Sequence, residues 1–251
     1  MTEYAWATVP AHTRIQRAPG PFAALPHLLD ADADDAAPLP PVPDFASGDA
    51  EPLLPLAGLS PRISTLDVYL RHEFPYSVEQ VYLRSGAASR LASAVERLPE
   101  PFGLVVFDGW RDPRLQQFLF DRAYAEPGLP PGFVAAPTED PARPTPHSTG
   151  GTADLSLSFE GQPLGLGTAF DEFSEHAFTR SLEVTSSGTT TAQDVARELR
   201  RLLFSVLSAA GFVVLAREWW HFEYGTRLWS AVTGAPARYH AAPRPRGDLA
   251  I

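Results

Sequence analysis

Two short stretches of the sequence carry side chains that suit metal-dependent hydrolysis. In the first, His147 and Asp154 stand seven positions apart with the pair Gly150-Gly151 between them, and in the second Glu218 precedes His221 by three positions. Two imidazoles and one carboxylate can hold a zinc ion and leave one coordination position for water. A further carboxylate beside that water can act as a general base. His147, Asp154 and His221 can therefore fill the ligand places of a zinc site, and Glu218 remains as a spare carboxylate for the role of base.

These spacings place two demands on the backbone. Successive side chains of a strand point to opposite faces, so residues an odd number of positions apart cannot serve one site from a regular strand. His147 and Asp154 therefore require a reversal of the chain, which the two glycines between them permit. Glu218 and His221 require a turn or a bulge at the two tryptophans that separate them.

Hydrophobic periodicity predicts the helices and strands that would position these residues. Helices are predicted over residues 86–98, 113–125 and 192–210. Strands are predicted over residues 103–107, 153–159, 212–215 and 217–224, with a further short strand and a loop within 63–82. Because strands and helices do not alternate regularly, we predict an α+β fold, in which a small and mostly antiparallel sheet packs against helices.

Local signals give more detail for three of these elements. Asp112, followed by proline, predicts an N-cap at the start of the second helix. Thr191 and Asp194 resemble a capping box for the third helix, which Gly211 would end. Residues 153–159 alternate between apolar and polar side chains, which predicts a strand that is buried on one face only.

Proline divides the chain into regions. Residues 1–60 are rich in proline and acidic residues, and they predict an N-terminal extension that is either a partly disordered arm or an ordered wrap over the domain. A single catalytic domain is predicted over residues 61–234 and a C-terminal tail over 235–251. Residues 126–146 hold seven prolines and predict a long loop that leads to His147.

Composition excludes several classes of protein. The 251 residues carry a formal charge of −10, which disfavours binding to nucleic acids and to anionic membranes. The absence of cysteine excludes disulfide scaffolds, thiol catalysis and cysteine-based zinc sites. We find neither a secretory signal nor an apolar run of membrane-spanning length, so we expect a cytoplasmic protein. A homo-oligomer is compatible with these features.

Three motifs together resemble those of the D-alanyl-D-alanine dipeptidases, the family of vancomycin-resistance-type zinc dipeptidases. The motifs are the stretch from His147 to Leu157, Glu218-Trp219-Trp220-His221-Phe222, and Val106-Phe107-Asp108-Gly109-Trp110-Arg111. They occur in the family's order, and the resemblance covers roughly residues 62–232. It implies a zinc peptidase fold of one domain with one zinc ion per chain. It also implies that Glu218 activates the zinc-bound water and then protonates the leaving amine.

The resemblance also implies roles for residues that bind the substrate. Arg111 would stabilise the oxyanion of the tetrahedral intermediate. The alternative for Arg111 is a surface ion pair with Asp108 or Asp112. Asp171 would hold the free amino group of the substrate, and its alternative is a solvated loop acid. Tyr69 would correspond to an active-site tyrosine of the family.

Two features depart from the family pattern. The Asn-Phe-Thr-Gly stretch of the family is replaced by residues 72–77, His-Glu-Phe-Pro-Tyr-Ser, and the extension over 1–60 has no counterpart. We predict a zinc-dependent dipeptidase that acts on a small dipeptide, D-Ala-D-Ala first among the candidates. The alternatives are a relative that modifies a specialised metabolite, a D,D- or L,D-carboxypeptidase that acts on peptidoglycan peptides, and a non-catalytic zinc-binding module.

Overall fold

The fold is built on one mixed sheet. The structure, a computed structural model, describes residues 4–33, 36–125, 129, 132–183 and 190–245. Within these residues the strand order is β1-β7-β6-β5-β3, and β9 joins this sheet through β6 and carries β8 on its other side. The strands of this sheet are β1 (Val9–Pro10), β3 (Ile63–Thr65), β5 (Phe102–Asp108), β6 (Thr152–Phe159), β7 (Gln162–Gly165), β8 (Val213–Val214) and β9 (His221–Glu223).

Most neighbouring strands run antiparallel. The exceptions are β1 with β7 and β3 with β5, which are parallel. A separate antiparallel pair joins β2 (Leu53–Pro55) to β4 (Tyr82–Arg84). The prediction of an α+β fold with a mostly antiparallel sheet is confirmed. None of the helices in the described ranges combines the length and the apolar character that crossing a bilayer requires.

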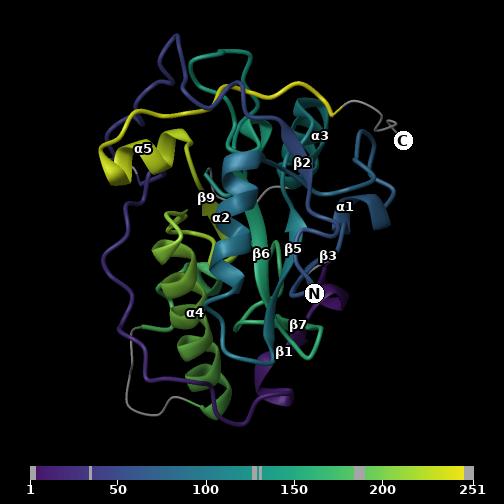
Figure 1. Cartoon of the computed structure of the whole chain (residues 1–251), viewed down its shortest axis with the longest axis vertical. Coiled ribbons are helices and arrows are strands. Elements are labelled where there is room, and N and C mark those ends of the chain that lie inside the picture. Colours follow the sequence, from purple (N-terminus) through teal and green to yellow (C-terminus); the bar gives the residue numbers. More distant parts are fainter. Residues whose placement is uncertain (1–3, 34–35, 126–128, 130–131, 184–189, 246–251) are drawn as a thin grey trace.

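Two helices cover one face of the sheet. Figure 1 shows α2 (Ser85–Val95) and α4 (Thr191–Ala209) side by side in front of β6. Helix α4 buries a stripe of apolar side chains at helical spacing, which includes Val195, Leu199 and Leu202. The other helices are α1 (Val68–Arg71), α3 (Pro113–Ala123) and α5 (Arg227–Thr233).

One of the two predicted helix caps is confirmed, and the other is wrong. Asp112 caps α3 and accepts a hydrogen bond from the Arg114 N–H, as predicted. The capping box of α4 consists of Thr190 and Gln193, not Thr191 and Asp194. The prediction was wrong by one residue because an amide side chain can complete the box as a carboxylate does, and the sequence offers both.

Two strand predictions also need correction. Strand β6 is buried on both faces as far as Ser158, because its polar side chains also have neighbours; Ser156 Oγ, for example, donates to the carbonyl of Leu164 at 2.6 Å. Of the strand predicted over 217–224, only β9 forms, since the residues before it make a turn. Residues 63–82 contain the short helix α1 as well as a strand.

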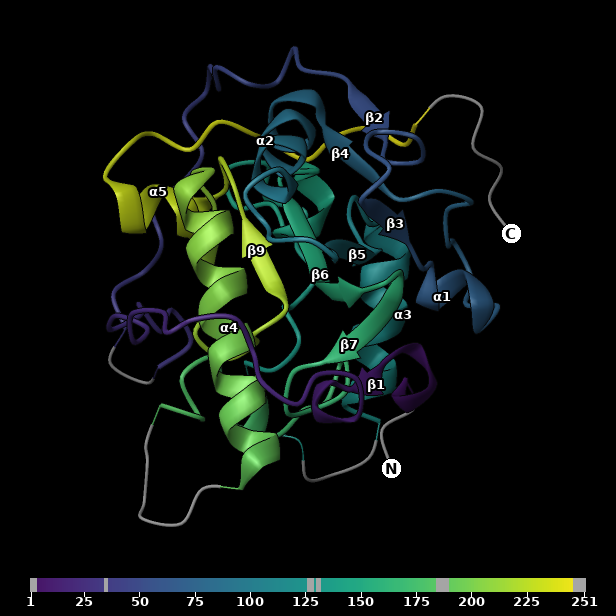
Figure 2. The same ribbon diagram turned by 60° about the horizontal axis from the view of Figure 1, so that its bottom comes forward.

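The described residues of the N-terminal region lie against the domain. Figure 2 shows β1 beside β7, and Ala7, Ile15 and Val42 are buried. Trp6 Nε1 donates to His72 Nε2 at 3.2 Å, so the segment that departs from the family pattern contacts this region. The division into an extension over 1–60, a catalytic domain over 61–234 and a tail over 235–251 stays a prediction.

The buried side chain of Arg84 links backbone from the N-terminal and C-terminal parts of the chain to the segment that follows His147. Its Nε donates to the carbonyl of Thr149 at 3.0 Å, and its Nη1 donates to the carbonyls of Asp49 and Glu51 at 2.7 and 2.8 Å. Its Nη2 donates to the carbonyl of His240 at 3.3 Å. A guanidinium can satisfy several carbonyls at once, so this one side chain fixes three separate backbone segments.

Glu51 strengthens the same junction. It accepts hydrogen bonds from Tyr239 Oη at 2.8 Å, Arg238 Nη2 at 2.7 Å and the Gly86 N–H at 2.8 Å. Burial by itself raises the pKa of Glu51, but these hydrogen bonds outweigh burial and hold its pKa below the ordinary value. The ionised carboxylate therefore stabilises the junction between the N-terminal region, α2 and the residues near Tyr239.

Replacing Glu51 by glutamine is expected to lower the melting temperature at pH 7 by about 2–4 °C. A carboxylate with a depressed pKa stabilises the folded state above its unfolded pKa, and this contribution is lost as the pH falls through the folded pKa. The difference between wild type and Glu51→Gln should therefore shrink below about pH 4. Circular dichroism melts across this pH range measure it, with the exposed Glu139→Gln as control. A difference that stays constant down to pH 3 would contradict the role of Glu51.

Candidate metal centre

A left-handed turn brings His147 and Asp154 to the same site. His147 lies on a 3-10 turn, η3 (His147–Thr149), which ends at Gly150 with φ of 72°. A Cβ atom at Gly150 would lie 2.5 Å from the Leu53 side chain, so this position needs glycine for its space as well as its conformation. The chain then enters β6, where Asp154 follows. The reversal that the spacing required is present.

A second turn brings Glu218 and His221 together. The His221 N–H lies 3.3 Å from the carbonyl of Glu218, and β9 begins at His221. His221 pairs with Asp154 across the β6–β9 ladder. Residues that face each other in a ladder lie on the same side of a sheet, so both side chains reach one site.

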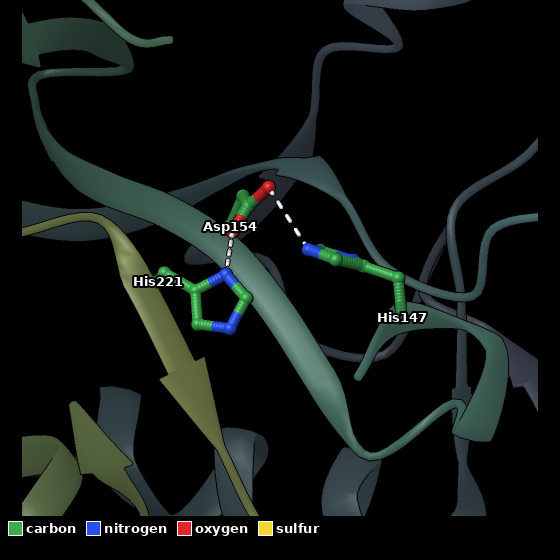
Figure 3. Close-up of side chains that lie close together, drawn as sticks. All are labelled: His147, Asp154 and His221. Atoms are coloured by element: carbon green, nitrogen blue, oxygen red, sulfur yellow. Dashed lines mark ion pairs between the residues drawn. The ribbon is translucent and has the colours of Figure 1, made fainter. Parts of the chain in front are cut away.

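Three side chains form a compact, buried cluster that could hold a metal ion. His147 Nε2 lies 3.2 Å from Asp154 Oδ2, and His221 Nδ1 lies 3.0 Å from Asp154 Oδ1 (Figure 3). One potential ligand atom from each residue lies within 4.8 Å of the others. Burial by itself raises the pKa of Asp154, but the two histidines outweigh burial and hold its pKa well below the ordinary value.

Neighbouring acceptors fix the orientation of both imidazoles. His147 Nδ1 donates to the carbonyl of Gly109 at 2.8 Å, and His221 Nε2 donates to Glu223 Oε1 at 2.9 Å. Each ring thereby turns its other nitrogen toward Asp154, which is the usual arrangement of metal-binding histidines. Among the described residues, Asp154 Oδ1 is buried and lies 3.0 Å from His221 Nδ1, with no hydrogen bond of good geometry. Two imidazole nitrogens and this carboxylate fit the donor set that zinc prefers.

Glu218 lies at the edge of this cluster. Its Oε2 is 3.5 Å from His221 Nδ1. Burial raises the pKa of Glu218 to about 8 against the lowering effect of His221, and the charges of Asp154 and Asp171 add to the rise. A carboxyl group with a pKa near neutrality can both accept and donate a proton at physiological pH.

Arg111 is buried and makes a polar network beside the cluster. Its Nε donates to Asp108 Oδ2 at 2.8 Å, so the ion pair considered as the alternative exists, but in the interior and not on the surface. Its Nη1 donates to Gln116 Oε1 at 2.7 Å. Its Nη2 lies 3.6 Å from Asp154 Oδ2 and donates to Tyr69 Oη at 3.2 Å. The guanidinium is held rigidly with one edge toward the cluster.

Tyr69 connects this network to Asp171. Its hydroxyl donates to Asp171 Oδ2 at 2.8 Å. Burial raises the pKa of Asp171 to about 7, the charge of Asp154 adds to the rise, and Arg111 opposes it. Asp171 also has φ of 54°, an unusual conformation for a residue other than glycine. The side chain is thus held in the site by its hydroxyl partner and is not a solvated loop acid.

A cavity of about 690 Å³ contains all of these groups. Its walls come from α3, the proline-rich loop from Gly132 to Pro146, the residues before and after β9, and the N-terminal region. The structure therefore brings together every residue that the sequence singled out for the site, namely His147, Asp154, His221, Glu218, Arg111, Asp171 and Tyr69.

The sequence did not predict the roles of three residues that orient the site, although it offered Asp108 as a surface partner of Arg111. Asp108 binds Arg111 and lies 3.2 Å from His147 Nδ1; a shift of register in β5 after Val106 brings it opposite Asp154. Glu223 orients His221, and Gln116 holds Arg111. Glu223 could have been found, because it stands two residues after His221 and so shares its face of a strand. Gln116 has no local signal, since its contact depends on how α3 packs.

The buried cluster fits a site that binds a metal ion. Comparison with known proteins gives the class of protein: the peptidase M15 family, described as D-ala-D-ala dipeptidase, matches residues 73–240. The D-alanyl-D-alanine dipeptidase of Synechocystis sp. is 31% identical over 175 residues, which span 59% of this chain and 71% of that protein. The protein of the same name from Escherichia coli is 31% identical over 153 residues, which span 59% and 69%.

The chain belongs to the D-ala-D-ala dipeptidase family of metallopeptidases, and it is an enzyme of the dipeptidase class. The family match includes the residues of the cluster, Glu218, Arg111 and Asp171, but it begins after Tyr69 and after the N-terminal region.

Replacing Asp154 by asparagine is expected to abolish stoichiometric metal binding. The amide is neutral and cannot balance a divalent cation between two imidazoles. Metal content after incubation with zinc and dialysis is measured by atomic emission. Asp140→Asn, in an exposed part of the proline-rich loop, is the matched control and should retain one ion per chain. Full retention of metal by Asp154→Asn would refute the ligand role.

Replacing Glu223 by glutamine should weaken metal binding by about 10–100-fold without abolishing it. The change keeps the shape of the side chain but removes the charge that orients and polarises His221. Thr226 Oγ1 also donates to Glu223, so the side chain should stay in place. Competition with a chromogenic chelator measures the dissociation constant. An unchanged constant would show that the carboxylate of Glu223 does not contribute to metal affinity.

Proposed function

We propose that this protein is a zinc-dependent dipeptidase that hydrolyses D-Ala-D-Ala, with one zinc ion held by His147, Asp154 and His221. The observation that carries this proposal is the convergence of a base, a cation and an acid around the cluster inside one cavity. Both relatives are named D-alanyl-D-alanine dipeptidases, and they support the choice of substrate. When bound, zinc supplies Lewis-acid polarisation of the scissile carbonyl and lowers the pKa of water toward about 7.

Glu218 acts as the general base. Its carboxylate removes a proton from the attacking water and then delivers that proton to the nitrogen of the leaving amine. The raised pKa suits both transfers, because the group can hold the proton between them. Its Oε2 lies 3.5 Å from His221 Nδ1, which supports a role beside the proposed ligands.

Arg111 stabilises the charge that develops on the carbonyl oxygen. A guanidinium held by Asp108 and Gln116 does not need to reorganise when the oxyanion forms, so its effect is larger in the transition state than in the ground state. The buried ion pair with Asp108 orients this cation, so the pair supports the proposed role.

Asp171 and Tyr69 hold the free amino group of the substrate. A buried carboxylate is the natural partner of an ammonium ion. Burial raises the pKa of Asp171 to about 7, and an arriving ammonium would favour its ionised form. The hydroxyl of Tyr69 keeps the carboxylate aimed into the cavity.

An assay against D,D-, L,D- and L,L-dipeptides tests this proposal. The zinc-loaded wild type should hydrolyse D-Ala-D-Ala, and Glu218→Gln should lower kcat by about 10²–10⁴-fold while it retains zinc. The exposed Glu175→Gln is the matched control and should keep full activity.

Two results would contradict the proposal. Equal kcat in wild type and Glu218→Gln would remove Glu218 from the role of base. Inactivity of the wild type on every D,D-dipeptide would remove D-Ala-D-Ala as the substrate, and hydrolysis of no dipeptide at all would favour a specialised metabolite instead.

A further inference from the structure

Part of the wall of the cavity comes from outside the region that matches the family. Ala31, Asp32 and Leu39 line the cavity, whereas the family match begins at residue 73. We call residues 30–33 and 36–42 the strap; Asp34 and Asp35 lie outside the described residues. In Figure 1 the N-terminal chain, coloured purple to indigo, passes α5 on its way to β2. The strap therefore adds a wall that the family motifs do not supply.

An arginine before β9 fixes the first half of the strap. Arg217 Nε pairs with both carboxylate oxygens of Asp30 at 3.0 and 3.2 Å, and its Nη2 donates to the carbonyl of Asp32 at 2.5 Å. An ion pair in which one N–H is shared between both carboxylate oxygens, combined with a backbone contact, restricts both position and orientation. Ala31, which lies between these two contacts, therefore has a fixed place in the wall.

A second arginine fixes the other half. Arg227 Nε and Nη2 donate to the carbonyls of Pro40 and Leu39 at 2.8 and 2.6 Å. Val42 is buried, and its N–H donates to the carbonyl of Ala142 in the proline-rich loop at 2.9 Å. The strap is thus attached to both the start of α5 and the loop that completes the cavity.

The second half of the strap, which holds Leu39, and Asp171 contact different elements of the fold. Arg227 begins α5 and follows Glu223, the partner of His221, whereas Asp171 binds Tyr69 of α1. Figures 1 and 2 both show β6 between α1 and α5. If the substrate's amino group binds Asp171, as proposed above, its leaving residue extends toward the strap.

The strap side of the cavity suits the carboxyl-terminal residue of a peptide. Arg143 and Arg227 line the cavity there, and their positive charge complements a terminal carboxylate. Leu39, Leu215 and Leu228 also line the cavity and supply apolar surface. The volume of about 690 Å³ falls within the range of about 300–1,000 Å³ that holds drug-sized ligands, which are much larger than a dipeptide of two alanines.

We propose that the strap is a specificity-determining wall that forms a subsite for the side chain of the leaving residue. The subsite takes dipeptides whose carboxyl-terminal residue has an apolar side chain larger than methyl, and Ala31 and Leu39 set the upper limit. The direction of the substrate rests on the proposed function.

Two alanines of the strap provide a matched pair of variants. Ala31 lines the cavity, whereas Ala37 is exposed and does not line it. Wild type, Ala31→Trp and Ala37→Trp are assayed with D-Ala-D-Ala, D-Ala-D-Phe and D-Phe-D-Ala. Wild type should hydrolyse D-Ala-D-Phe. Ala31→Trp should lower kcat/KM for D-Ala-D-Phe by about 10–100-fold, with changes below about threefold for the other two peptides. Ala37→Trp should match wild type throughout.

A second variant keeps the test valid if Ala31→Trp does not fold. Leu39→Ala enlarges the subsite and should raise the ratio of kcat/KM for D-Ala-D-Phe over D-Ala-D-Ala by about threefold or more. Equal effects of both variants on all three peptides would overturn the role of the strap, as would selective effects on D-Phe-D-Ala.

Adding the matching L,L- and L,D-peptides to this panel separates failure of this inference from failure of the proposed function. Wild-type inactivity on all D,D-peptides with activity on the matching L,L- or L,D-peptides would refute the proposed substrate, and the strap is then tested on those active peptides. Inactivity on every peptide would overturn both. Wild-type activity on D-Ala-D-Ala with no cleavage of D-Ala-D-Phe would overturn the subsite alone.

Discussion

A carboxylate buried at the centre of a sheet is the constraint on which the site depends. Asp154 is 2% exposed and lies on β6, the strand that three others flank. An uncompensated charge in such a place costs several kcal/mol, so the fold must bring partners to it. Three separate segments do so: the turn before Gly150 brings His147, β9 brings His221, and the residues after the irregular end of β5 bring Arg111, which Asp108 holds in place. The pairing of the strands in the sheet therefore also brings together the residues of the site.

Each of these partners is itself held by a further polar group. Glu223 accepts from His221 and from Thr226, and Gln116 accepts from Arg111 while its Nε2 donates to the carbonyl of Ala135 at 2.8 Å. A buried polar network is stable only when its members are satisfied, so the orientation of the central groups depends on contacts well away from them. Through Gln116, the proline-rich loop takes part in setting the position of the arginine beside the cluster.

The sequence singled out the residues that the structure brings together in the cavity, but it did not predict most of the residues that hold them in position. A histidine or an acid that stands in a motif with glycines or tryptophans indicates its chemistry through its residue type and its spacing. His147, Asp154, Glu218 and His221 could therefore be singled out from the sequence alone. Gln116 and Arg84 act through distant carbonyls, and no local pattern announces a contact between residues far apart in the chain. The burial of β6 was not predicted for the same reason. Alternating apolar and polar residues predict a strand, but whether both of its faces are buried depends on segments elsewhere in the chain.

The junction at Arg84 has a consequence for how the enzyme acquires its site during synthesis. Ala242 N–H donates to the carbonyl of Ser148, beside His147, and Arg84 spans from Thr149 to His240. His240 and Ala242 are synthesised after every residue of the cluster. Because chains begin to fold while they are still being made, the nascent chain holds all of the cluster residues before the segment around His147 gains its last contacts. Until then, the segment that carries His147 lacks the contacts that His240 and Ala242 supply.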